Sequence, residues 1–203
     1  ILTEGEAARG VRMLEEAGLR HQILREVHWS EQLDRALRLL NRGVAPDFAM
    51  AVLLHETPPA DVIRIVVRLK FSRAEMQHTV SLVENLAKFA AVDRMSTSAL
   101  KRFFRLDRFD DYLEFARIHA VAADHDLQQY QYAVARYQAW SSADTAPPSF
   151  ISGEDLIAMG FKPGPLFKKI LTQVEDEQLE GSIVSREQAL EFVRSRYSGG
   201  GPS

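Results

Sequence analysis

Residues 152–171 constrain the fold more than any other stretch, because they encode a helix, a tight turn and a second helix. Ser152, with Asp155 three residues on, is close to the capping box that starts a helix. Gly160 stands where a short helix would end in a left-handed residue. Pro165 suits the first position of the second helix, where its missing N–H has no helical partner anyway. The stretch therefore predicts two helices joined at a sharp corner.

Charge is distributed unusually along the second helix. Lys168 and Lys169 fall in its first turn and Lys162 lies just before it, whereas acidic residues gather near its end (Glu175, Asp176, Glu177 and Glu180). The helix dipole favours the opposite order by about 0.3–1 kcal/mol per charge. A basic helix start flanked by glycine is what a phosphate site needs. Solvated surface lysines would give the same pattern, so both interpretations stay open here.

Helical spacing of apolar residues recurs along the whole chain, and no alternating strand pattern of useful length is present. The sequence therefore predicts an all-α fold, with a multi-helix bundle body and a small helical tail. Residues 48–54 are apolar all round, as in a central buried helix. Two buried stripes are predicted at helical spacing, Met76, Val80, Val83 and Ala87 in the body and Leu166, Phe167, Ile170, Leu171 and Val174 in the tail.

The one stretch with linker composition is residues 141–149, which are rich in serine, alanine and proline. It predicts a body over residues 1–140 and a tail over residues 150–197. The glycine-rich residues 198–203 are predicted to be a disordered end.

Composition excludes several classes of protein. The chain of 203 residues has no cysteine, so it can form neither a disulfide framework nor a thiolate zinc site, which fits the cytoplasm. No apolar run reaches the roughly 18–20 residues of a membrane span, so no membrane partner is expected. Because the net charge is −3, any contact with nucleic acid must come from local basic patches.

The tail resembles a known family. Residues Gly153, Asp155 and Leu156, the corner Gly160-x-x-Pro163-Gly164-Pro165 and the later Gln178-Leu179-Glu180-Gly181 are similar to the C-terminal region of bacterial class II tRNA nucleotidyltransferases (CCA-adding enzymes) and poly(A) polymerases. Residues 12–27 carry a weaker likeness, in which Arg25 replaces a proline. The resemblance implies a transferase family whose separate N-terminal domain performs catalysis, while this region holds the RNA.

That resemblance implies a partner and a site. The partner would be tRNA or a tRNA-like RNA, gripped by its backbone and shape while a nucleotidyltransferase domain N-terminal to this chain extends the 3′ end. Magnesium and the nucleoside triphosphate would belong to that domain, since its catalytic motifs are missing from these residues; no cofactor, metal site or catalytic residue is expected here. The first RNA-binding candidates are Lys162, Gly164, Lys168 and Lys169, and the second set is Arg64, Arg68, Lys101, Arg102 and Arg105.

Two alternative functions remain at this point. His55 and Glu56 resemble the His-Asp pair of HD phosphohydrolases, with His119 where that fold has an aspartate. A metal-dependent phosphohydrolase needs imidazoles and carboxylates around a divalent ion, and three departures from the pattern favour an HD-like scaffold that has lost its metal. The other alternative is a helical protein-interaction module, which would present one contiguous apolar patch.

Overall fold

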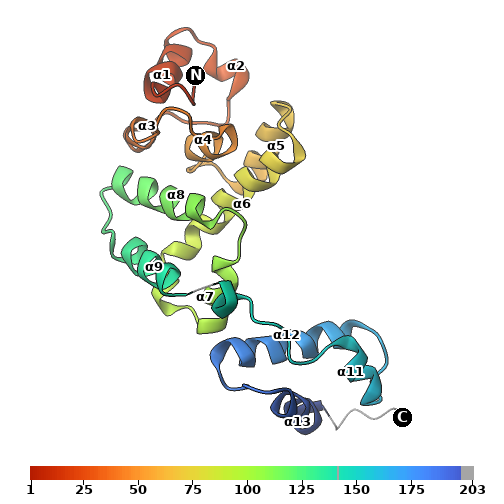
Figure 1. Cartoon of the computed structure of the whole chain (residues 1–203). Coiled ribbons are helices and arrows are strands. Elements are labelled where there is room, and N and C mark those ends of the chain that lie inside the picture. Colours follow the sequence, from red (N-terminus) through yellow and green to blue (C-terminus); the bar gives the residue numbers. More distant parts are fainter. Residues whose placement is uncertain (141, 198–203) are drawn as a thin grey trace. The chain divides into compact units, whose positions relative to one another are not determined.

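The chain is helical throughout the part that the computed structural model describes, residues 1–140 and 142–197, and these residues contain no β-strand (Figure 1). The all-α prediction is confirmed. In chain order the elements are α1 (Ala7–Glu16), α2 (Arg20–Ile23), α3 (Glu31–Arg38), α4 (Pro46–Leu53), α5 (Pro59–Arg68), α6 (Arg73–Phe89), the 3₁₀ helix η1 (Val92–Arg94), α7 (Thr97–Phe104), α8 (Phe109–Ala122), α9 (Gln128–Ala139), α10 (Ser142–Thr145), α11 (Gly153–Ala158), α12 (Pro165–Glu180) and α13 (Arg186–Tyr197).

The helices group into two compact units. The first unit comprises Ile1–Asp93 and Arg108–Ala135, and the second comprises Arg94–Asp107 and Arg136–Ser203. This division assigns α7 to the same unit as the tail helices, and the short helix α10 lies within the segment with linker composition. The domain boundaries expected from composition stay a prediction, and the end at 198–203 lies outside the described residues.

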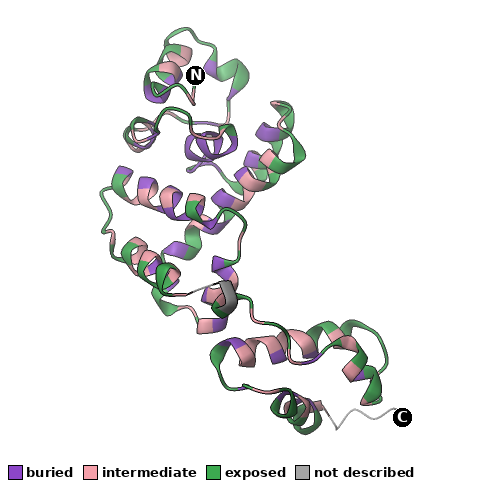
Figure 2. Cartoon of the chain, in the orientation of Figure 1, coloured by how far each residue is buried: buried purple, intermediate pink, exposed green. Residues whose placement is uncertain are grey.

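Helix α4 forms the centre of the first unit. Pro46 occupies its first position, and residues 47–53 are all buried (Figure 2). The helix packs against α3, α6 and α8, so that it is covered on every side. The buried central helix expected from the apolar run 48–54 is therefore confirmed.

The inward face of α6 differs from the predicted stripe. Val83 is buried, but Met76 and Val80 are only half-buried and Ala87 is exposed. The buried residues of the helix are Thr79, Leu82, Val83, Asn85 and Phe89. Because α6 packs against α4, α5 and α8, its covered face is wider than one stripe and is turned away from Ala87.

The tail helices of the second unit enclose a small core of their own. Its buried members are Ile151, Leu156, Ile170, Val174, Ile183, Ala189 and Val193. Two of these, Ile170 and Val174, belong to the predicted stripe of α12, whereas Phe167 and Leu171 are half-buried. The prediction was wrong for Leu166, which is 43% exposed, because it lies in the first turn of α12, beyond the packed core.

Candidate nucleic-acid interface

The corner before α12 is built as the sequence predicts. Ser152 and Asp155 form a reciprocal capping box at the start of α11. Gly160 ends that helix with φ of +89°, and its N–H donates to Ile157 O over 2.9 Å. The next N–H, of Phe161, donates to Leu156 O over 3.0 Å. This pair of bonds is the Schellman arrangement, which turns the chain sharply and satisfies the last carbonyls of α11.

The start of α12 is an exposed basic end without a side-chain cap. Gly164 stands at its N-cap and offers no side chain, Pro165 follows, and the first turn contains no acidic residue. The ammonium groups of Lys162, Lys168 and Lys169 are exposed, and none of the three forms an ion pair within the described part of the chain. Pro165 has no N–H and the N–H of Phe167 donates to Gly164 O over 3.0 Å, so the positive end of the dipole and these lysines are what favours an anion at this point.

A shallow groove continues from this basic end along α12. It has a volume of about 680 Å³ and lies within the second unit. Gly164, Phe167 and Lys168 line it near the start of the helix, and Thr172 and Glu175 line it further along. The groove is therefore basic at one end and acidic at the other.

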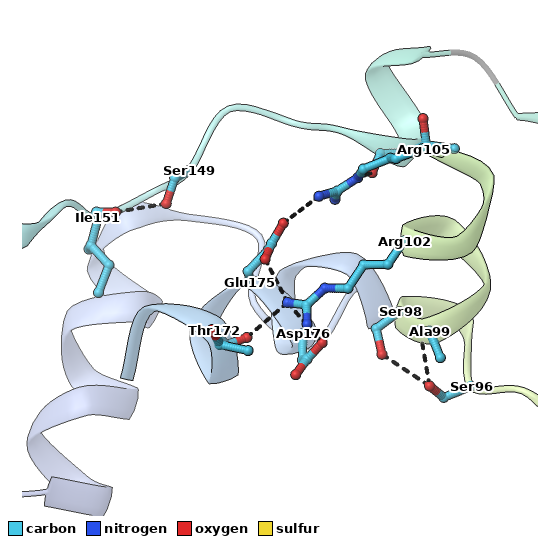
Figure 3. Close-up of polar contacts among 11 residues, drawn as sticks. Ser96, Ser98, Ala99, Arg102, Arg105, Ser149, Ile151, Thr172, Glu175 and Asp176 are labelled. Carbon is cyan, nitrogen blue, oxygen red and sulfur yellow. Dashed lines mark hydrogen bonds and ion pairs between the residues drawn. The ribbon is translucent and has the colours of Figure 1, made fainter. Parts of the chain in front are cut away.

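Arg102 of α7 and Arg105, the residue that follows this helix, are paired within the protein (Figure 3). Arg102 Nη2 lies 2.6 Å from Glu175 Oε2 and 3.1 Å from Asp176 Oδ1, and it donates to Thr172 O over 3.2 Å. Arg105 Nη1 lies 2.6 Å from the other oxygen of Glu175. Although burial alone would raise the pKa of Glu175, the hydrogen bonds and charges of the two arginines hold that pKa below its usual range.

Lys101, the third cation of α7, is also engaged. Its Nζ donates to Leu179 O over 2.9 Å and lies 5.3 Å from the centre of the Trp140 ring. A carbonyl oxygen and an aromatic face both attract an ammonium group. The cations of α7 thus hold α7 to α12 inside the second unit.

The two arginine candidates of α5 have acidic partners in the first unit. Arg68 donates two bonds of 2.7 Å to the carboxylate of Glu26 and one of 3.0 Å to Ile23 O. The hydrogen bond from Arg68 lowers the pKa of Glu26 to about 2. Arg64 lies 2.8 Å from Asp61, one turn before it on the same helix, and is otherwise exposed.

The structure brings together the histidines singled out in the sequence, but not as a metal centre. The ring centres of His55 and His119 are 5.5 Å apart, and that of His125 is 6.0 Å from His119. Among the described residues, no group of three or more histidine, cysteine, aspartate or glutamate side chains is arranged to hold a metal ion. The residues present do not fit a divalent ion, so no step of a phosphohydrolase reaction is derived from them.

Sequence reasoning missed the role of the acidic end of α12. Glu175 and Asp176 are the partners of Arg102, and the carboxylate of Glu180 accepts the N–H of Ser98 over 2.6 Å in the first turn of α7. The only signal in the sequence was their position at the C-terminal end of a helix, where the dipole disfavours acidic residues. Contacts between distant segments explain their position.

Comparison with known proteins gives the family. A family model described as tRNA nucleotidyltransferase domain 2 matches residues 47–193, which is most of the chain. An A-adding tRNA nucleotidyltransferase of Halalkalibacterium halodurans is 44% identical over 48 residues, which are 24% of this chain and 11% of that protein. A CC-adding tRNA nucleotidyltransferase of Synechocystis sp. is 25% identical over 130 residues, which are 63% of this chain and 31% of that protein.

The matched segments span between about a tenth and a third of the length of these two relatives. No solved structure matches the chain. In the described part of the chain, every helix is too short or too polar to cross a membrane.

Proposed function

This chain belongs to the tRNA nucleotidyltransferase domain 2 family, and we propose that it is the RNA-holding region of a nucleotidyltransferase that extends the 3′ end of tRNA or a tRNA-like RNA. The observation that carries this proposal is the start of α12, where Lys162, Lys168 and Lys169 lie at or next to the positive end of a helix without a side-chain cap and have no acidic partner among the described residues. Such an end suits a sugar-phosphate backbone.

Catalysis is assigned in this proposal to a nucleotidyltransferase domain outside these residues. Support comes from the length of the match, which covers 31% of the CC-adding relative. In this proposal magnesium and the nucleoside triphosphate belong to that domain as well. A role in tRNA processing would place the protein in the cytoplasm.

Recognition in this proposal works through shape and backbone. The deep, narrow major groove of an A-form helix hides its base edges from side chains, so proteins hold double-stranded RNA mainly through phosphates and 2′-hydroxyls. Lysines and backbone N–H groups suit this task, because they bind phosphate oxygens without reading a base. The corner at Gly164 would therefore contact tRNAs of different sequence alike.

The test is a charge reversal at the start of α12. The double variant Lys168→Glu with Lys169→Glu should weaken binding of a tRNA transcript and flatten its salt dependence, because each lost phosphate contact removes counterion release. Filter binding at several salt concentrations measures both quantities.

A matched control reverses two charges elsewhere in the same unit. Arg194→Glu with Arg196→Glu changes the net charge of the chain equally but alters only exposed side chains of α13. Equal losses of affinity in the two double variants, or no loss in either, would reject the start of α12 as the RNA contact.

A further inference from the structure

The first unit contains a cavity that the RNA-holding role leaves unexplained. Its volume is about 730 Å³, and it is lined by the turn before α5 and the first residue of α5, the C-terminal half of α6, the end of α8 and the start of α9. This volume is within the range of roughly 300–1,000 Å³ that is typical of sites for small molecules. All of its lining residues belong to the first unit.

Two buried polar atoms in the cavity lining lack hydrogen-bond partners in the described part of the chain. They are Nδ1 of His119 and Oε1 of Gln129. Buried polar atoms are normally paired in folded proteins, so these two mark His119 and Gln129 as lining residues whose hydrogen-bonding capacity the described chain leaves partly unused.

The two inner histidines are held as neutral rings. His55 donates its Nδ1 proton to Val52 O over 2.8 Å, which leaves the lone pair on Nε2. Burial lowers the pKa of His55. Burial, followed by the neighbouring histidines, lowers the pKa of His119 as well. Neither ring therefore supplies a positive charge to the cavity near neutral pH.

The charged residues of the lining are all acidic. Glu56, Glu84 and Asp126 contribute carboxylates, and no lysine or arginine is among the described residues that line the cavity. The remaining wall is largely apolar and includes the rings of Phe89 and Tyr130. Carboxylates beside a wall of low dielectric attract a cation and repel an anion, and aromatic faces add to the attraction.

We propose that this cavity binds a small organic cation, in which a protonated amine is carried on an apolar or aromatic body. The ammonium group faces the carboxylates, while the body lies against the apolar wall. A nucleotide or an RNA strand is disfavoured here, because its phosphates would meet the three acids. The site is thus separate from the start of α12, and its occupant differs in charge from RNA.

The test uses three probes of similar size, phenethylamine, 2-phenylethanol and phenylacetate, titrated into the full chain. Nuclear magnetic resonance of the histidine rings and of the Gln129 side-chain amide reports binding at the cavity itself. Phenethylamine should shift these signals and bind at least roughly tenfold more tightly than phenylacetate. The two probes have similar aromatic bodies but carry charges of opposite sign.

Two tryptophan variants on one helix show whether the cavity is the site. Ala87 lines the cavity and Ala74 does not, and both are exposed residues of α6. Ala87→Trp should weaken phenethylamine binding by at least roughly tenfold by filling the space, whereas Ala74→Trp should leave it unchanged. Equal binding of the three probes, equal loss in the two variants, or no shift of the His119 and Gln129 signals would overturn the proposal.

Discussion

The two basic regions of the second unit differ in what neutralises them. On α7, Arg102 and Arg105 meet the carboxylates of Glu175 and Asp176, and these contacts fasten α7 to the second half of α12. At the start of α12, Lys168 has no acidic partner among the described residues. The two regions contain similar numbers of cations in the sequence. Those of the α7 region stabilise the fold, whereas those at the start of α12 remain available to bind a ligand.

This difference also explains the charge order of α12. Acids near its end oppose the helix dipole, but they are the partners of the α7 arginines, so contacts between helices offset that cost. Lysines at its start oppose the dipole without any such contact inside the described chain. A lysine that opposes the helix dipole without a compensating contact is therefore better evidence for an external ligand than the presence of a basic residue alone.

The largest expected effect is on the stability of the α7 region. Arg102→Ala removes two carboxylate contacts and one carbonyl contact from a side chain that is about one-third exposed. The free energy of unfolding should fall by about 1–3 kcal/mol, because the acids of α12 lose a charged hydrogen-bond donor. Urea denaturation followed by circular dichroism measures it. Lys169→Ala is the matched truncation at the start of α12, and it should change the free energy of unfolding by less than about 0.5 kcal/mol. Similar losses of stability in both variants would contradict the difference between the two basic regions.

A smaller effect is expected at the paired arginine of α5. Glu26 has a pKa of about 2 in the folded protein against an ordinary 4.5, so its pair with Arg68 adds stability above pH 4.5. That contribution is lost as pH falls from 4.5 through about 2. Glu26→Gln should therefore lower stability at pH 7 by about 1 kcal/mol or less, as is usual for an ion pair at the protein surface, and the difference in stability from the wild type should narrow at pH 2–3. A gap that stays constant with pH would contradict the pairing.

The smallest effect has the opposite sign. Lys168→Gln with Lys169→Gln removes two exposed charges that the dipole disfavours, so the free energy of unfolding should rise by about 0.3–0.5 kcal/mol in total, at the low end of the dipole's contribution. Thermal unfolding at low salt shows the gain best, because salt screens the interaction. A loss of stability would mean that these lysines have stabilising contacts inside the protein.

Local patterns predicted the elements well, but not the pairing of charges. The capping box at Ser152, the left-handed Gly160 and the proline at the start of α12 depend on neighbouring residues only, so the sequence was sufficient for them. The partners of Arg102 and Arg68 lie 73 and 42 residues away along the chain. No local spacing encodes such contacts, so Arg68, Arg102 and Arg105, which have distant acidic partners, entered the candidate set together with three lysines that have none among the described residues.

The cavity of the first unit shows the same limit. The motif at His55 suggested an HD-like site from residue types, and the structure does bring His55 beside His119. Glu56 belongs to that motif, but Glu84 comes from α6, Asp126 from the turn before α9 and Gln129 from α9, which a local motif cannot reveal. The residue types of the motif indicated the region of the cavity, whereas the charges around the cavity depend on the fold.

The most direct test of the contrast between the two regions is the slope of RNA affinity against salt concentration. It compares Lys168→Gln with Lys169→Gln against Arg102→Gln with Asp176→Asn, which removes one cation together with an acid that contacts it and leaves the pair of Arg105 with Glu175 in place. The lysine pair should lower the slope by about 0.7–0.9 per lost phosphate contact, and the arginine–aspartate pair should leave it unchanged. An unchanged slope for the lysine pair, or an equal decrease for both, would contradict the assignment of the start of α12 to the RNA backbone.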